Sequence, residues 1–192
     1  MGRHREFSES EVVEKAMMAF WRAGWRDTTP QSLVEVTGLS RSSLYATFGS
    51  KQGLFLAALD LYVEKQHSFL TQFLAEGTMR EALERMYDNL VEYMRPGGGG
   101  LTCLVASSLL EVSAEDEETV ARVAMGRVRV REAFVARFQR AIDEGELDGS
   151  RSADELAQFI SMVNDGIQVA ARAKTSKEEL RSIARIAVDT VC

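Results

Sequence analysis

The sequence predicts an all-α fold of about nine helices. Apolar residues recur every three or four positions along most of the chain, and no stretch alternates apolar and polar residues for long. The two prolines are Pro30 and Pro96, and the 14 glycines gather at breaks between the apolar stripes. These breaks divide the chain into expected helices at 8–24, 30–37, 41–48, 51–75, 79–95, 102–113, 115–144, 153–173 and 177–191.

Capping residues mark several of the predicted helix starts. A Ser or Thr followed three residues later by Glu predicts a capping box, in which the hydroxyl and the carboxylate each satisfy a free backbone N–H. This spacing occurs at Ser8/Glu11, Thr78/Glu81, Ser152/Glu155 and Ser176/Glu179. Thr29 before Pro30 predicts a further cap, because proline is tolerated in the first turn of a helix, where its missing N–H is not needed.

Composition excludes several classes of protein. The 192 residues are 45% hydrophobic and 27% charged, which argues against disorder. Two cysteines cannot form a disulfide framework, and the chain has neither an apolar signal core nor a membrane-length apolar run, so we expect a cytoplasmic protein. No catalytic motif or metal-ligand cluster occurs, so we expect no enzyme activity, no metal and no cofactor. The alternative is an all-α small-molecule carrier or enzyme without DNA binding.

Residues 30–48 carry the pattern of a helix-turn-helix, in which two short helices meet at a steep angle and a glycine absorbs the turn. The first helix ends at Gly38, and Ser40 caps the second. Packing between the two helices is expected from Leu33, Leu39, Leu44 and Phe48. Polar side chains on the second helix are then free to read base edges in the major groove, where Arg41 can pair with guanine. A plain two-helix corner is the alternative.

The run at residues 28–51, TTPQSLVEVTGLSRSSLYATFGSK, resembles the DNA-binding domain of the TetR family of bacterial transcriptional repressors. The resemblance implies a DNA-binding domain at 1–52 with three helices and a helical ligand-binding and dimerisation domain at 53–192. It also implies a homodimer that binds a palindromic operator in double-stranded DNA and is released by an effector. The family's contact positions fall on Thr29, Arg41, Ser42, Ser43, Tyr45, Thr47 and Lys51. The family often has a bulky or imidazole side chain where this chain has Ala46 and Thr47, so the operator sequence does not transfer.

Charge is divided unevenly along the chain. The net charge is −6, but residues 1–51 hold seven basic and six acidic side chains, a net of +1. The remainder holds 16 basic and 23 acidic side chains, a net of −7, so the acidic total does not argue against a DNA partner. The basic arm at residues 2–5 fits an adjacent minor groove, with a frayed terminus as the alternative. The arginines within 115–144 are expected to form a mostly solvated face.

The segments 153–173 and 177–191 are expected to form the homodimer interface. The first is apolar nearly all round and must be covered on every side. A second copy would cover it in a four-helix arrangement across a two-fold axis, whereas burial in the chain's own core is the alternative. The candidate interface residues are Leu156, Ile160, Val163, Ile167, Leu180, Ile183 and Ala187.

A pocket for an unknown small-molecule effector is expected among inward-facing residues of the C-terminal region. The candidates are Phe73, Met86, Tyr87, Phe134, Phe138, Phe159, Met162 and Asp165. Apolar stripes of this kind are usually core, and Asp165 either binds the effector or pairs with an arginine such as Arg127 or Arg172.

Cys103 follows a glycine run near the start of a helix, where the positive end of the helix favours the reactive thiolate. The surrounding residues resemble a subset of TetR-like repressors with a cysteine at this place, some of which respond to electrophiles or oxidants. Cys103 is therefore a candidate electrophile or redox sensor, and an inert buried residue is the alternative.

Overall fold

The structure is a computed structural model that describes residues 8–93, 103–113 and 115–192. Within these ranges the regular elements are α-helices, which confirms the predicted all-α class. The predicted basic arm at residues 2–5 lies outside the described residues. The helices are α1 (Glu9–Asp27), α2 (Pro30–Thr37), α3 (Arg41–Phe48), α4 (Lys51–Ala75), α5 (Met79–Tyr93), α6 (Leu104–Glu111), α7 (Glu117–Asp143), α8 (Ala153–Arg172) and α9 (Lys177–Val191).

The helix starts follow the capping residues with one exception. Capping boxes form at Ser152/Glu155 and Ser176/Glu179, and reciprocal hydrogen bonds join Thr78 and Glu81. Thr29 caps α2 together with Ser32, and Pro30 occupies the first turn. The prediction at Ser8 is wrong, because the Ser8 hydroxyl hydrogen-bonds the Ser10 hydroxyl at 2.5 Å and makes no cap hydrogen bond.

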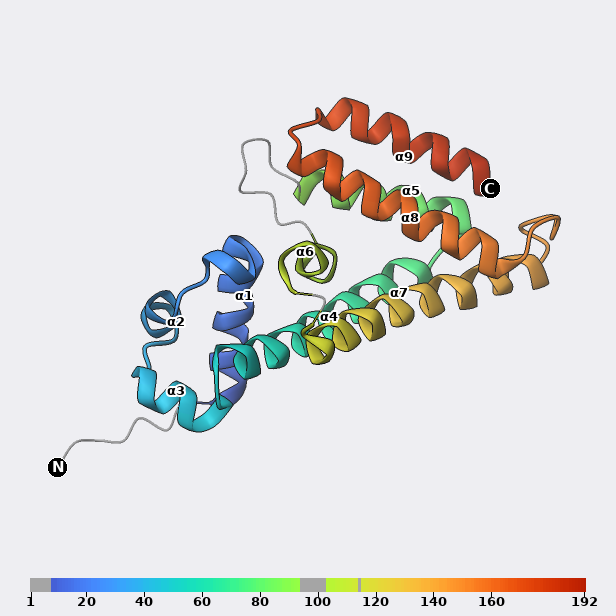
Figure 1. Cartoon of the computed structure of the whole chain (residues 1–192). Helices are drawn as coiled ribbons and strands as arrows, with labels where there is room; N and C mark the ends of the chain where they lie inside the picture. Colours follow the sequence, from blue (N-terminus) through green and yellow to red (C-terminus); the bar gives the residue numbers. More distant parts are fainter. Residues whose placement is uncertain (1–7, 94–102, 114) are drawn as a thin grey trace.

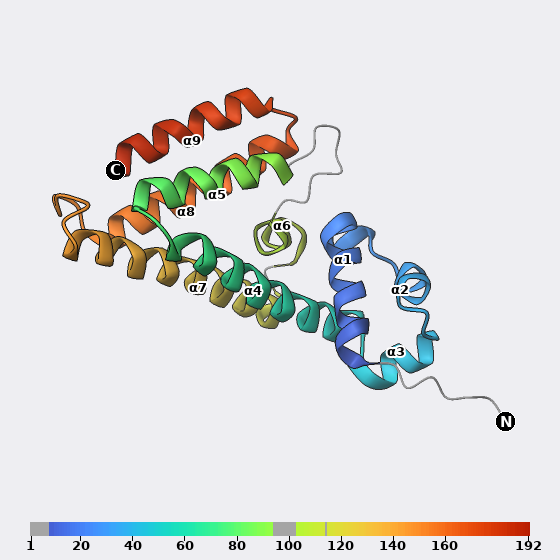
Figure 2. The same ribbon diagram turned by 180° about the vertical axis from the view of Figure 1, so that it is seen from behind.

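Helices α1 to α3 form a unit at one end of the long helix α4 (Figure 1). Helices α4 and α7 run side by side along the molecule, and α5, α8 and α9 pack at the far end. Seen from behind, α5 lies alongside α9 (Figure 2). The short helix α6 lies between α1 and the α4–α7 pair and contacts all three helices. In the ranges given above, no helix has the length and apolar character needed to span a membrane.

Two hydrophobic clusters form the core, and α4 contributes to both. Its first half places Leu54 and Phe55 with α1 to α3, and its second half places Leu70 and Leu74 with α5 and α7 to α9. The first cluster also includes Cys103 and residues that follow it on α6. The proposed boundary between residues 52 and 53 falls in the first turn of α4, and it stays a prediction.

One of the arginines expected on a solvated face of α7 is buried. Arg137 is 5% exposed and donates from Nε to the Leu74 carbonyl oxygen at 3.1 Å. Its Nη2 donates to the Gly77 carbonyl oxygen at 3.0 Å and to Glu146 Oε1 at 3.1 Å. The guanidinium thus fastens the end of α7 to the turn between α4 and α5, a role that periodicity alone does not disclose.

Candidate nucleic-acid interface and central cavity

The α2–α3 pair has the geometry of a helix-turn-helix. Gly38 ends α2 in the left-handed conformation, with φ 75°, and its N–H donates to the Val34 carbonyl oxygen at 2.9 Å. The Ser40 hydroxyl caps α3 by accepting from the Ser43 N–H at 3.1 Å. Leu33 and Leu44 are 0% and 1% exposed and join the same cluster as α1 and α4. Apolar packing thereby holds α3 at a defined angle and leaves its polar face outward.

Most predicted contact residues on α3 are accessible. Arg41, Ser42 and Thr47 are exposed, and Ser43 and Tyr45 are half-buried. The Arg41 guanidinium lies 5.5 Å from the centroid of the Tyr45 ring, a cation–π geometry that orders the two side chains together. The Thr47 hydroxyl donates to the Ser43 carbonyl oxygen at 3.1 Å. The N-terminal half of α3 therefore presents an ordered cation and several hydroxyl groups.

Thr29 and Lys51 already make contacts within the chain. The Thr29 hydroxyl accepts from the Ser32 N–H at 3.1 Å as the cap of α2. Nζ of Lys51 donates to the Trp25 carbonyl oxygen at 2.6 Å and lies 4.2 Å from the centroid of the Trp25 ring. Burial lowers the pKa of Lys51, and the carboxylates of Asp27 and Glu111 oppose that shift. A phosphate contact from Lys51 would have to replace these interactions, and it stays a prediction.

Glu111, at the end of α6, anchors the unit formed by α1 to α3, and the sequence analysis did not single it out. Its Oε2 accepts from the backbone N–H of Trp25 at 2.6 Å and of Arg26 at 3.3 Å. Both N–H groups are turned outward by Gly24, whose φ of 84° and ψ of 173° are nearly exclusive to glycine. A Cβ at Gly24 would lie 2.6 Å from the Glu111 carboxylate, so the glycine also makes room for it.

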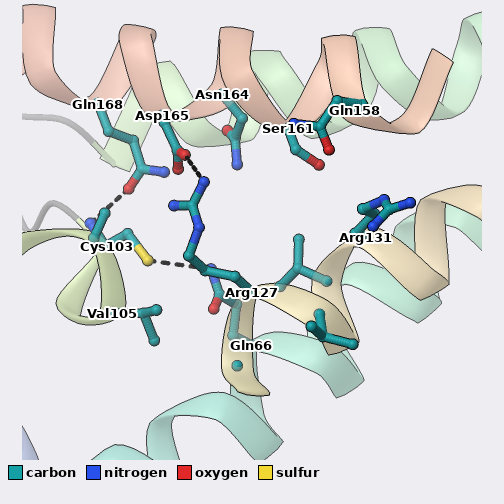
Figure 3. Close-up of a pocket in the computed structure, with 14 residues that line it drawn as sticks. Gln66, Cys103, Val105, Arg127, Arg131, Gln158, Ser161, Asn164, Asp165 and Gln168 are labelled. Atoms are coloured by element: carbon teal, nitrogen blue, oxygen red, sulfur yellow. Dashed lines mark hydrogen bonds and ion pairs between the residues drawn. The ribbon is translucent and has the colours of Figure 1, made fainter. Parts of the chain in front are cut away.

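A central cavity of about 210 Å³ lies between α4, α6, α7 and α8 (Figure 3). Of its 14 lining residues, nine carry a polar group or a thiol, and five are apolar or glycine positions on α6 and α7. The lining residues are Gln66, Cys103, Val105, Ala106, Gly126, Arg127, Val128, Val130, Arg131, Gln158, Ser161, Asn164, Asp165 and Gln168. In the described residues, no group of His, Cys, Asp and Glu side chains is arranged to hold a metal ion.

Cys103 lies at the α6 side of the central cavity and is 7% exposed. Its N–H donates to Gln168 Oε1 at 2.5 Å, and its sulfur accepts from Gln66 Nε2 at 3.6 Å. Burial raises the pKa of Tyr62, and contact with the Cys103 thiol raises it further. The thiol therefore faces the cavity as the N-cap residue of α6, with two polar neighbours around the sulfur.

Arg127 crosses the central cavity from α7 to α8, where its Nη2 lies 2.7 Å from Asp165 Oδ2 (Figure 3). The interpretation of Asp165 as the partner of an arginine is confirmed. Two other lining atoms, Arg131 Nε and Ser161 Oγ, are buried without a hydrogen-bond partner among the described residues. They come from α7 and α8, the two long walls of the cavity.

The other seven predicted pocket residues do not line the central cavity. Those in the core are Met86, Tyr87, Phe134 and Phe138, with Phe73 partly buried beside them. Burial raises the pKa of Tyr87, whose hydroxyl has no partner among the described residues. Phe159 and Met162 are 39% and 60% exposed on α8 and point away from the core. Of the eight candidates, Asp165 is the one that lines the central cavity.

The candidate dimer residues also divide into two groups. Those buried in the chain's own core are Leu156, Ile160, Ile167, Leu180 and Ala187, with Val163 partly buried against them. Ile183 is 52% exposed. We define the outer apolar face as the exposed apolar residues of α8 and α9, namely Phe159, Met162, Val169, Ile183 and Ile186. The buried candidates on α8 lie on the side of that helix that packs in the chain's own core, where α8 contacts α7 and α9, whereas the outer apolar face lies on another side.

Comparison with known proteins agrees with this architecture. The family model for bacterial regulatory proteins of the tetR family matches residues 12–58, which include the helix-turn-helix. A second model, for the tetracyclin repressor-like C-terminal domain, matches residues 77–187. The chain belongs to the TetR family. This family consists of transcriptional regulators and not of enzymes, so this chain is a DNA-binding regulator of transcription.

This chain is similar to other regulators that match it over most of their length. It is 28% identical to the uncharacterised regulator YezE of Bacillus subtilis, over 94% of each chain. It is 29% identical to the transcriptional repressor ComR of Escherichia coli, over 95% of this chain and 88% of ComR.

Solved structures of other regulators share the fold of this chain. A cysteine mutant of the regulator CifR complexed with 26-bp double-strand operator DNA is 27% identical, with a TM-score of 0.87 and 100% of each chain covered. The reduced form of Escherichia coli NemR has a TM-score of 0.84 over 95% of this chain and 97% of NemR. At 19% identity, the NemR comparison supports the fold alone.

Proposed function

We propose that this TetR-family chain is a repressor that binds a palindromic operator as a homodimer and is released when an effector occupies the central cavity. The observation that carries the proposal is the exposed guanidinium of Arg41, held against the half-buried Tyr45 ring, at the start of the second helix of a helix-turn-helix. ComR is named a repressor and CifR is described in complex with operator DNA, and both match this chain over most of its length.

In the proposed complex, the start of α3 enters the major groove, where Arg41 donates two hydrogen bonds to a guanine. Replacing Arg41 with alanine should weaken operator binding by at least about tenfold, the usual cost of one bidentate base contact. Operator fragments selected by the purified protein, followed by gel shifts, test this. Arg140→Ala, which removes an exposed arginine at the far end of α7, is the matched control. If Arg41→Ala and Arg140→Ala bind the operator with equal affinity in gel shifts, α3 is not the helix that contacts the bases.

The outer apolar face is proposed as the homodimer interface. It holds five large apolar side chains on two adjacent helices, and a palindromic operator needs two recognition helices about one turn of DNA apart. Ile183→Glu should convert the dimer to a monomer, because the new carboxylate would be buried without a partner. Met125→Glu is the control, because Met125 is equally exposed but lies on α7. Light scattering after size exclusion gives the mass, and a dimer that survives Ile183→Glu contradicts this interface.

Cys103 is proposed as the electrophile-sensing residue of the central cavity. The thiolate sulfur would add to the β-carbon of an activated alkene, forming a C–S bond while the α-carbon takes a proton from water. The adduct would occupy the cavity beside Gln66 and Gln168 and favour a conformation that releases DNA. N-ethylmaleimide should label Cys103 in the native protein and abolish gel shifts, whereas Cys103→Ser should keep binding DNA after treatment. Resistance of native Cys103 to labelling, or release of the Cys103→Ser protein, would show that Cys103 is an inert core residue.

A further inference from the structure

The central cavity contains two hydrogen-bond donors that the described part of the chain leaves unsatisfied. Arg131 Nε and Ser161 Oγ are both buried and both line the cavity. A buried polar atom without a partner is unfavourable, and a site with several such atoms is suited to a ligand that satisfies them. An arginine Nε can donate and cannot accept, so the group that satisfies it must be an acceptor.

The charges around these atoms favour an anionic acceptor. Arg127 is already paired with Asp165 across the cavity. The Nη2 of Arg131 pairs with the exposed carboxylate of Asp154, which does not line the cavity, and this pair leaves Nε without an acceptor. The wall itself holds two arginines and one aspartate, and a guanidinium donates more strongly to a charged acceptor than to a neutral one. A carboxylate has the two oxygens needed to accept from Arg131 Nε and from Ser161 at once.

The volume of the cavity and its aliphatic lining limit the chemical group to which the carboxylate can be attached. The cavity volume of about 210 Å³ is below the range that holds drug-sized molecules. Four aliphatic side chains, from Val105, Ala106, Val128 and Val130, provide an apolar surface for a short hydrocarbon group. A large hydrophobic molecule of the kind expected from an aromatic-lined pocket does not fit this lining.

We propose that the central cavity binds a small monocarboxylate, with Arg131 and Ser161 as its carboxylate-binding residues. The carboxylate lies against α7 and α8, and its hydrocarbon part extends along the aliphatic wall. This inference rests on the proposed function only in treating the ligand as the effector that releases DNA.

Isothermal titration calorimetry with matched probes tests the proposal. The probes are butyrate, hexanoate, benzoate and phenylacetate, each compared with its own primary amide at millimolar concentration and constant ionic strength. At least one carboxylate should bind at least about tenfold more tightly than its amide, which is the effect of one charge-assisted hydrogen bond. Equal binding of every acid and its amide, or no binding by any acid, would overturn the proposal.

Variants of Arg131 and Ser161 test whether these two residues bind the carboxylate. Arg131→Gln should reduce the affinity for the preferred carboxylate at least about tenfold and remove the preference over the amide. Arg129→Gln is the control, because it removes an arginine and a surface ion pair from the same helix outside the cavity wall. Ser161→Ala changes no charge and should weaken carboxylate binding without altering amide binding. Equal affinities in Arg131→Gln and Arg129→Gln would place the carboxylate elsewhere and overturn the assignment.

DNA binding is measured on the same preparations, so that the two proposals can fail separately. A protein that retains selected operator fragments but prefers no carboxylate refutes the ligand class and leaves the repressor proposal intact. A protein that prefers a carboxylate but selects no DNA refutes the repressor proposal and leaves the carboxylate site intact.

Discussion

The contact between Glu111 and the kink of α1 predicts a measurable loss of stability when the carboxylate is removed. In Glu111→Ala, the Trp25 N–H loses a hydrogen bond of 2.6 Å and the Arg26 N–H loses a longer one of 3.3 Å. Hydrogen bonds to a charged acceptor contribute about 1.5–3 kcal/mol when buried, and less when exposed. Because the first bond is partly buried and the second exposed, we expect a total loss of about 2 kcal/mol.

Thermal and urea unfolding measure this loss. For a chain of this length, 2 kcal/mol corresponds to a fall in Tm of about 4–8 °C. Glu111→Gln keeps a neutral acceptor and should lose about 1 kcal/mol. All variants are compared at one protein concentration, because association changes the apparent stability.

A matched control variant and amide hydrogen exchange distinguish loss of the Glu111 contact from a non-specific loss of stability. Glu115→Ala removes an exposed carboxylate four residues away and should change stability by less than about 0.5 kcal/mol. Amide hydrogen exchange should accelerate at Trp25 and Arg26 in Glu111→Ala and not in Glu115→Ala. Equal Tm values for the two alanine variants, with unchanged exchange at the kink, would refute the role assigned to Glu111.

Three further outcomes are expected. Arg137→Met should lower the free energy of unfolding by about 3–5 kcal/mol in urea titrations, because it removes the buried guanidinium that pairs with Glu146 and donates to the Leu74 and Gly77 carbonyl oxygens; a loss below 1 kcal/mol contradicts this. Gly24→Ala should destabilise the protein by at least about 1–3 kcal/mol, because alanine is strained at φ 84° and its methyl group meets Glu111; an unchanged Tm argues against the kink. Partial burial raises the pKa of the Cys192 thiol to about 11, so iodoacetamide labelling of this thiol, followed by mass spectrometry, should be slow at pH 8 and rise through pH 11; a plateau by pH 9 is inconsistent with that value.

Local chemistry made the helices predictable. Capping boxes such as Ser152/Glu155 and Ser176/Glu179 act within four residues, so the sequence alone indicates where α8 and α9 begin. The turn at Gly38 is predictable for the same reason, since its positive φ is a requirement on one residue. The side-chain partners of Lys51 were not predictable, because Trp25 lies 26 positions earlier and approaches only through tertiary packing.

Helix α8 shows why the faces of an apolar helix are harder to assign than its existence. Its residues divide between the core, where Ile160 is 0% exposed, and the outer apolar face, where Met162 is 60% exposed. Hydrophobicity does not distinguish a residue that packs on its own chain from one that remains exposed, so the sequence predicted Ile160 at the dimer interface and Met162 in the pocket, whereas Ile160 is buried in the core and Met162 is exposed.

The central cavity did leave a signal in the sequence. Polar residues recur on α8 with helical spacing, at Gln158, Ser161, Asp165 and Gln168. A polar stripe along an otherwise apolar helix must face either solvent or a polar cavity. Asp165 of this stripe was predicted in the pocket, whereas the other predicted pocket residues are aromatic residues and methionines outside the stripe.

Helix α6 connects the central cavity to the DNA-binding unit, and the geometry of its two ends sets a requirement for any effector. The helix has eight residues, about 12 Å in length. At one end the Cys103 N–H is held by Gln168 in the cavity wall, and at the other Glu111 holds the kink at Trp25. A ligand shifts a conformational equilibrium only by its difference in affinity for the two states. If the Glu111 contact contributes about 2 kcal/mol, an effector that separates α6 from α1 must favour the separated state by about 30-fold for that contact alone. Glu111→Ala should therefore raise the affinity of the DNA-free protein for the effector, whereas Arg41→Ala, at the operator-binding face, should leave that affinity unchanged; equal effector affinities in the two variants would contradict this coupling.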